Sequence, residues 1–264
     1  MQKPNLRCLT EDQVTSFKLN GFLVIEDVLT VDEVRVLADR CDMIAAGEAD
    51  HIPESSIQLE RVFREGEMPV GNQVLSMRKL FNIAVYDPVM WTHVVHDKIV
   101  GIITDLLGTA DIKLYGDQLF MKPPQVGSEQ PWHQDSASWR DIFPMDLVTA
   151  WTAIDEATEA NGCLNFAPGT HRWGMMHRDQ AAWFLDDFGS EQWPIVSAPL
   201  KPGSISFHHS LVLHQSNANH TGQRRRGYAV HYMRATSCQD STVTDAPKMP
   251  PFRQVLGRSF EGRV

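Results

Sequence analysis

Two short segments far apart in the chain carry residue types that bind transition metals. The first is PWHQD at residues 131–135, where a strand conformation would turn His133 and Asp135 to the same face. The second is HHSLVLHQS at residues 208–216, which offers a further imidazole. Two histidines and one carboxylate form the facial triad of non-haem iron(II) sites, which leaves positions open for a co-substrate and O2. A His-x-Asp triplet alone is common by chance, so the prediction depends on the second segment.

Three histidines in the second segment compete to be the third ligand. His208 and His209 directly follow an expected strand, so we expect them at its end or facing solvent. His214 is favoured because Ser216 and Asn217 follow it and a basic residue lies at a suitable distance beyond.

That basic residue belongs to a run of three arginines, residues 224–226, before the expected strand 228–232. Neighbouring residues of a strand point to opposite faces, so Arg225 would point away from Arg224 and Arg226. We expect Arg225 to face the metal and to form a charge-assisted fork with the far carboxylate of a dicarboxylate such as 2-oxoglutarate. Arg224 remains the alternative, since a shift of one residue exchanges the faces. The run could also be a solvated charge cluster.

The elements that must position these residues change in character along the chain. Capping boxes begin at Thr10 and Thr30, a strand is expected at residues 22–25, and a helical region is expected from Pro88 to Leu107. Later segments alternate between apolar and polar residues and predict strands at 112–121, 147–154, 164–166, 204–207 and 228–233. Helices followed by strands indicate an α+β fold with a mainly β core, as a sandwich or barrel.

Two segments are expected to cover the binding pocket. Residues 48–75 are polar and interrupted by Pro and Gly, which predicts a long loop. The other segment is 173–198, with a helix expected at about 179–188. No motif in either segment identifies a ligand.

The region from Gln118 to Tyr232 resembles the phytanoyl-CoA dioxygenase (PhyH) family of iron(II)- and 2-oxoglutarate-dependent oxygenases. The resembling pieces, in order, are MKPP (121–124), WHQD (132–135), AWTA (150–153), NGCL (161–164), PGTHR (168–172), PGS (202–204), LHQSN (213–217) and RRR (224–226). NGFLV (20–24) is similar to the opening helix and strand of the family. The resemblance implies one domain over residues 1–264 with the double-stranded β-helix fold, a jelly-roll, cupin-like barrel with flanking N-terminal helices.

The same resemblance implies roles for single residues. Fe(2+) at the catalytic centre would be bound by His133, Asp135 and His214, and the far carboxylate of 2-oxoglutarate by Arg225. Further co-substrate residues would be Ser216, Trp151, Gln118 and Lys79. The implied reaction is hydroxylation of a small molecule by O2, with release of succinate and CO2. Related halogenating enzymes have Ala or Gly in place of Asp135, so its presence favours hydroxylation.

Two other classes stay open beside an oxygenase. One is a non-catalytic jelly-roll module that keeps a metal for structure or sensing. The other is a cupin-type metalloenzyme that does not use 2-oxoglutarate. Arg225 argues against both, because neither needs a buried group that binds a dicarboxylate.

The composition is globular and limits the partners. The 264 residues are 42% apolar and 22% charged, with a net charge of −9, so binding to nucleic acid or an anionic membrane is not expected. Neither a secretory signal nor a membrane span is expected, and four scattered cysteines fit a reducing, cytoplasmic location. We expect a small, polar or anionic substrate, drawn to a basic entrance built from Lys79, Lys122, Arg140, Arg172 or Arg178.

Overall fold

The computed structural model of the chain describes residues 7–176, 193–243 and 249–264. Its α-helices are α1 (Glu11–Asn20), α2 (Val31–Ala45), α3 (Arg61–Arg64), α4 (Pro88–Val94) and α5 (Asp97–Leu107). Short 3-10 turns lie at Glu54–Ser56, Val74–Ser76, Asp135–Ala137 and Thr170–Trp173.

The strands pair in antiparallel fashion into two main sheets. They are β1 (Phe22–Ile25), β2 (Ile57–Leu59), β3 (Met77–Phe81), β4 (Ile112–Lys122), β5 (Gln130–His133), β6 (Ile142–Phe143), β7 (Val148–Ala153), β8 (Leu164–Phe166), β9 (Val196–Ala198), β10 (Ile205–His209), β11 (His214–Ser216), β12 (Arg225–Arg234), β13 (Cys238–Gln239) and β14 (Gln254–Leu256). The large sheet has the order β1-β10-β7-β12-β4-β3-β2, with β14 beside β4. The smaller sheet has the order β5-β11-β8-β9, and β13 pairs with β6.

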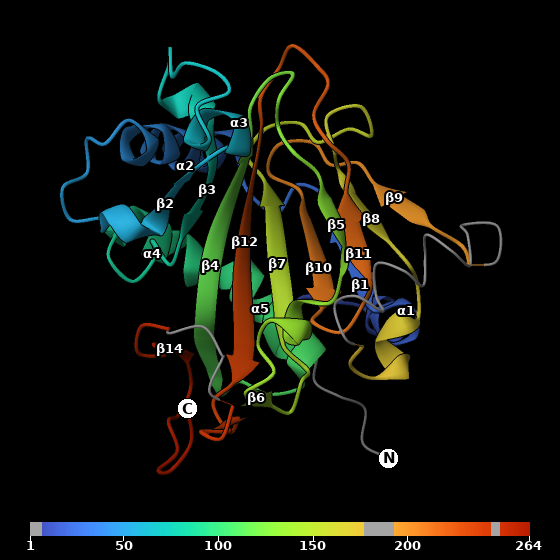
Figure 1. The fold of residues 1–264 in the computed structure, drawn as a ribbon. Helices are drawn as coiled ribbons and strands as arrows, with labels where there is room; N and C mark the ends of the chain where they lie inside the picture. Colours follow the sequence, from blue (N-terminus) through green and yellow to red (C-terminus); the bar gives the residue numbers. More distant parts are fainter. Residues whose placement is uncertain (1–6, 177–192, 244–248) are drawn as a thin grey trace.

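These two sheets form the layers of a double-stranded β-helix, with helices outside it (Figure 1). Side chains of α2, α4 and α5 pack with the large sheet in one hydrophobic cluster. Side chains of the smaller sheet pack with the large sheet in a second cluster. The expected α+β fold with a mainly β core and flanking helices is therefore confirmed.

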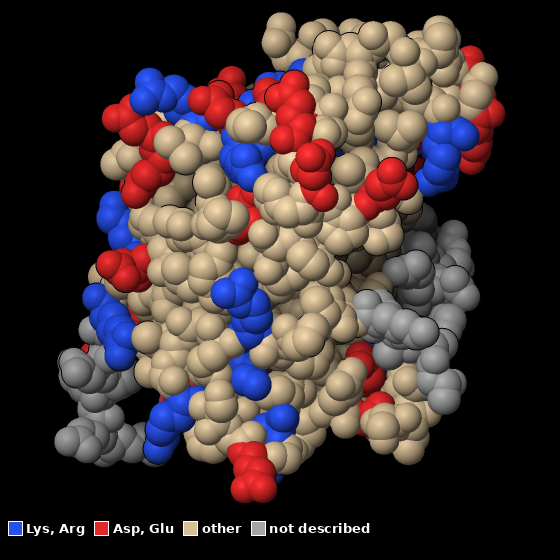
Figure 2. Space-filling model, turned by 90° about the vertical axis from the view of Figure 1, so that its left-hand side faces the viewer, with Lys and Arg blue, Asp and Glu red and all other residues tan. Residues whose placement is uncertain are grey.

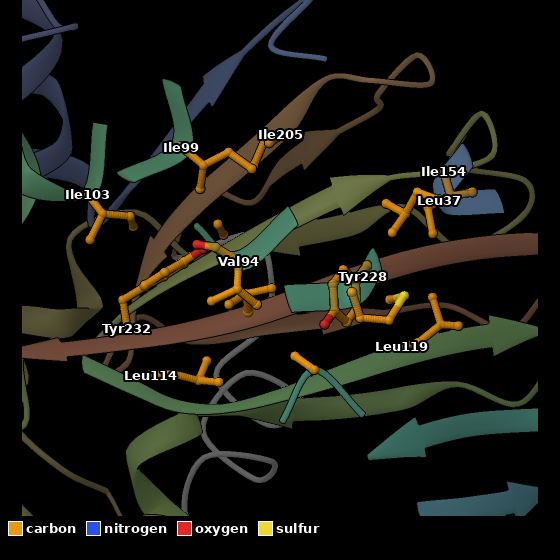
Figure 3. Close-up of a cluster of buried hydrophobic side chains, with 14 of the residues drawn as sticks. Leu37, Val94, Ile99, Ile103, Leu114, Leu119, Ile154, Ile205, Tyr228 and Tyr232 are labelled. Carbon is orange, nitrogen blue, oxygen red and sulfur yellow. The ribbon is translucent and has the colours of Figure 1, made fainter. Parts of the chain in front are cut away.

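The alternation of side chains along β12 and β7 separates the core from the site. On β12, Tyr228 and Tyr232 lie in the cluster shared with the helices, and the Tyr232 hydroxyl donates to the Val94 carbonyl oxygen over 2.8 Å. Figure 3 shows this cluster, with labelled side chains that include Leu37, Val94, Ile99, Ile103, Leu114, Leu119, Ile154 and Ile205. The residues that alternate with these tyrosines along β12 therefore point the other way, toward the smaller sheet.

A close contact on this inner face requires a glycine in β12. A β-carbon on Gly227 would come within 1.8 Å of the Trp151 ring, which is itself buried in the second cluster. The missing side chain leaves room for the indole between the two sheets, where it can form a wall of the site.

Helix ends follow the sequence signals. Thr10 and Thr30 each cap a helix with a complete capping box, formed with Gln13 and Glu33 respectively. Gly21 ends α1 in the left-handed conformation with φ of 82°. The expected helix from Thr30 and the strand at 22–25 are confirmed.

Other expectations differ from the structure. Residues 48–75 are not one long loop, because β2 pairs with β3 at the edge of the large sheet and α3 follows it. The helical region after Asp87 is two helices, α4 and α5, separated by Val95 and His96. The helix expected at about 179–188 falls outside the described residues.

In the described ranges, no helix is both long and apolar enough to cross a bilayer. Figure 2 shows the side of the molecule that lies on the left in Figure 1, which carries α2, α4, β2 and β3. Basic and acidic side chains are scattered over this face among uncharged ones. This distribution is unlike the clustered basic surface of a nucleic-acid-binding protein.

Candidate metal centre

Two side chains from neighbouring strands and one from a 3-10 turn meet at the candidate metal centre. His133 ends β5 and His214 begins β11, and their Cα atoms face each other across the antiparallel pair. Asp135 begins the 3-10 turn Asp135–Ala137. The expectation that His133 and Asp135 share one strand is therefore wrong, because the strand ends between them. The turn nevertheless brings the carboxylate back beside the imidazole.

The three ligand atoms are spaced as a single metal ion requires. They lie within 4.8 Å of one another, and Asp135 Oδ1 is 3.7 Å from Nε2 of both His133 and His214. Nδ1 of His133 is 2.8 Å from the Pro131 carbonyl oxygen, and Nδ1 of His214 is 3.0 Å from that of Val212. Each Nδ1 therefore carries the proton, which leaves Nε2 as the nitrogen that can bind a metal.

The electrostatics of the cluster favour a cation. Burial alone would raise the pKa of Asp135, but the nearby His214 and a hydrogen bond from His208 hold it below its ordinary value. Burial, and then repulsion from His133, lowers the pKa of His214. The cluster thus offers one carboxylate and two imidazoles, a donor set that fits iron(II).

Two residues to which the sequence analysis gave no supporting role hold this geometry. Gln134 is buried, and its amide donates to the carbonyl oxygens of Gly174 (2.9 Å) and Leu211 (2.8 Å), which fixes the segment between His133 and Asp135. His208, expected at a strand end or facing solvent, lies near the end of β10 and is only 2% exposed, so the first of these two positions is the right one. Its Nε2 lies 3.4 Å from Asp135 Oδ2. No local pattern in the sequence distinguishes it from a surface histidine.

A cavity lies between the two sheets and borders the cluster. Its walls include His133, Asp135 and His214 together with the expected co-substrate residues Gln118, Trp151, Ser216 and Arg225.

Arg225 is buried at this cavity with unused hydrogen-bonding capacity. It is 1% exposed, and its Nη2 donates to the Gly162 carbonyl oxygen over 2.8 Å. Within the described part of the chain, Nε and Nη1 have no hydrogen-bond partner. The guanidinium carbon lies 5.2 Å from the centre of the Trp151 ring. Burial lowers the pKa of Arg225 to about 10, so the side chain is still cationic at neutral pH.

The neighbouring arginines point the other way. Arg224 forms a two-pronged ion pair with Asp42 of α2, with distances of 2.9 and 2.7 Å. Arg226 pairs with Asp155 over 2.8 Å and with Asp42 over 2.9 Å. Of the three, Arg225 is the one that lines the cavity.

Lys122 is a second basic residue of this cavity, one that the sequence suggested only for its entrance. Its Nζ donates to the carbonyl oxygens of Ser216 (3.2 Å) and Asn217. Burial, and then repulsion from Arg225, lowers the pKa of Lys122 to about 6. Burial and the nearby Arg225 thus both disfavour a positive charge on Lys122.

A second cavity adjoins the first and shares Gln118, Phe120, Gln130, His133, Asp135 and His231 with it. Its own walls are Ser55, Lys79, Phe81, Asn82, Tyr115, Gly116, Asp117, Ser138, Trp139 and Met249. Lys79, expected with the co-substrate residues, thus lies in this second cavity, with Nζ 4.5 Å from the Phe81 ring centre. Arg140 and Arg172 line neither cavity, and Arg178 falls outside the described residues.

A double-stranded β-helix that gathers two histidines and an aspartate around one point defines the class of non-haem iron oxygenases. A family model described as phytanoyl-CoA dioxygenase (PhyH) matches residues 17–227. The chain therefore belongs to the phytanoyl-CoA dioxygenase family, as its motifs predict.

Related proteins match over most of their length. A probable phytanoyl-CoA dioxygenase of Caenorhabditis elegans is 25% identical over 246 residues, or 88% of this chain and 77% of that protein. A phytanoyl-CoA dioxygenase of Arabidopsis thaliana is 28% identical over 280 residues, or 94% and 98%.

Solved structures share the fold. EctD from S. alaskensis, with 2-oxoglutarate and 5-hydroxyectoine, superposes with a TM-score of 0.75 at 22% identity over 97% of this chain and 89% of that one. The alpha-ketoglutarate-dependent carbocyclase SnoK from nogalamycin biosynthesis gives 0.73 at 21% identity over 94% and 96%.

Proposed function

We propose that the protein is an iron(II)- and 2-oxoglutarate-dependent dioxygenase that hydroxylates a small molecule, as one domain over residues 1–264. The observation that carries the proposal is Arg225, whose Nε and Nη1 lack partners among the described residues in the cavity that also holds the His-Asp-His cluster. Unpaired N–H groups of a buried guanidinium are costly, and a dicarboxylate would satisfy them.

Each residue has a distinct task in this proposal. His133, Asp135 and His214 hold iron(II), which supplies the activation of O2. Arg225 binds the far carboxylate of 2-oxoglutarate with the help of the Ser216 hydroxyl, and Trp151 and Gln118 form walls that exclude water. The products of the co-substrate are succinate and CO2.

The direct test is an anaerobic titration with iron(II) and 2-oxoglutarate, followed by an assay for succinate after O2 is admitted. Succinate formation is expected even without a substrate, at a low rate. A non-catalytic metal module would bind iron and form none, and a cupin-type enzyme would bind iron but not 2-oxoglutarate.

We infer further that the substrate is a small polar or anionic metabolite. Lys79 lies in the cavity that adjoins the metal cluster, so it would attract an anion toward the metal within a protein of net charge −9. We expect kcat/KM for an anionic substrate to fall several-fold between low and high ionic strength, because salt screens this attraction. Preferential turnover of a neutral, lipid-like substrate with no salt dependence would contradict this.

Co-substrate binding should depend on pH through Lys122. Its pKa of about 6 means that the amine is neutral at pH 7, and a carboxylate bound beside it would raise that pKa. Binding at pH 7 therefore takes up a proton. Affinity should fall as pH rises above about 6 and level off below it, where the free protein is already protonated.

Calorimetric titration of 2-oxoglutarate at pH 7, in buffers of different ionisation enthalpy, measures the number of protons taken up on binding. Lys122→Met is the control, since it keeps an unbranched side chain and removes the titrating group. Equal binding heats in all buffers for the unmodified protein would show that Lys122 does not change its charge.

A further inference from the structure

The two oxygens of Asp135 have different surroundings. Oδ1 faces Nε2 of His133 and of His214, at 3.7 Å from each. Oδ2 points the other way, 3.0 Å from the Thr149 hydroxyl and 3.4 Å from Nε2 of His208. Oδ2 therefore holds the carboxylate in place, and Oδ1 faces the imidazoles of His133 and His214.

Sheet register explains how these donors come together. Thr149 of β7 is the Cα partner of His208 in β10 on one side and of His231 in β12 on the other. All three side chains are buried, and they form a polar row across the inner face of the large sheet, next to Asp135. We call His208, Thr149 and His231 the polar row.

The direction of each hydrogen bond follows from the acceptor at the end. The Asp135 carboxylate can only accept hydrogen bonds, so the Thr149 hydroxyl must donate its single proton to Oδ2. Thr149 must then accept from Nδ1 of His231, which is 2.8 Å away. Nε2 of His231 is left to accept from the Gln118 amide nitrogen, at 3.3 Å. Burial lowers the pKa of His231 to about 4, which agrees with this neutral form.

We propose that Thr149 is a positioning residue: with His208, and itself oriented by His231, it holds Oδ2 of Asp135 so that Oδ1 alone faces the metal. This rests on the proposed function, in which the cluster holds iron(II). A carboxylate that used both oxygens would take a position that the co-substrate or O2 needs. Groups that orient a metal ligand in this way typically change metal affinity or activity by about 10- to 100-fold.

The test compares two substitutions with opposite effects on shape and chemistry. Thr149→Val keeps the shape of the side chain and removes the hydroxyl, whereas Thr149→Ser keeps the hydroxyl and removes the methyl group. Iron(II) affinity is measured by anaerobic competition with a chelator, without turnover. We expect Thr149→Val to weaken iron(II) binding by about 10- to 100-fold, and Thr149→Ser to bind as the unmodified protein does.

A double variant tests whether His231 affects iron(II) binding through its hydrogen bond to Thr149 or through packing alone. Thr149→Val leaves Nδ1–H of His231 buried without its acceptor, and His231→Phe removes that donor. If His231 acts through Thr149, adding His231→Phe to Thr149→Val should cause no further loss of iron(II) affinity. The double variant also relieves the unsatisfied donor if Thr149→Val alone folds poorly.

The outcomes distinguish the proposals. If the unmodified protein does not bind iron(II), the proposed function fails. If it binds iron(II) and Thr149→Val binds equally well, or Thr149→Ser is the weaker variant, the positioning role is wrong and the proposed function stands.

Discussion

Asp135→Ala is expected to abolish succinate formation and hydroxylation, and to weaken iron(II) binding by more than about 100-fold. Asp135 is the only carboxylate of the described three-residue cluster, and its Oδ1 lies 3.7 Å from each imidazole nitrogen. Without it, a divalent ion would face two neutral imidazoles in a buried site with no compensating charge. Anaerobic iron(II) titration and a succinate assay measure the two effects separately.

The control for Asp135→Ala is Asp146→Ala. Asp146 pairs with Arg234 over 2.6 Å and lines neither cavity of the site. This substitution also removes a carboxylate, so it reports any general effect of the lost charge on folding, and iron(II) binding should be retained. Both variants are assayed in chloride-free buffer, so that no halide can fill the position of the lost carboxylate. Full hydroxylation by Asp135→Ala there would overturn the metal assignment.

Features that depend on near neighbours in the chain could be predicted from the sequence. Capping boxes at Thr10 and Thr30, and the glycine at residue 21, involve groups only a few residues apart. The long strands β4 and β12 contain enough residues for their alternation to be visible. The same alternation predicted that Arg225 and Arg224 would point to opposite faces.

Features that depend on long-range pairing could not be predicted. Strands β5 and β11 are 4 and 3 residues long, too short to show a period, although they carry His133 and His214. The polar row joins three strands that are not consecutive in the chain, so neither Thr149 nor His208 has a local signature. Lys122 depends on the same kind of distant contact, with the carbonyl oxygens of Ser216 and Asn217.

Arg225→Ala is expected to raise the dissociation constant of 2-oxoglutarate by orders of magnitude while sparing iron(II) binding. Truncating one side of a buried, charge-assisted pair costs roughly 2–5 kcal/mol. At about 1.4 kcal/mol for each factor of ten, this corresponds to about 30-fold to several thousand-fold. Arg225→Lys should recover part of the affinity, since it keeps the charge but not the fork of N–H groups. Titration of iron(II)-loaded protein with 2-oxoglutarate measures both.

The matched control is the neighbouring Arg224→Ala, which removes the same side chain from the opposite face of the sheet. Arg224 pairs with Asp42, and both side chains are partly exposed, at 27% and 36%. Such a pair contributes about 0–1 kcal/mol to stability, so co-substrate affinity should not change. If Arg224→Ala weakened 2-oxoglutarate binding and Arg225→Ala did not, Arg224 and not Arg225 would face the cavity. The register of β12 would then be wrong as well. Because only one of the two can face the cavity in a given register, this pair of variants tests strand and site together.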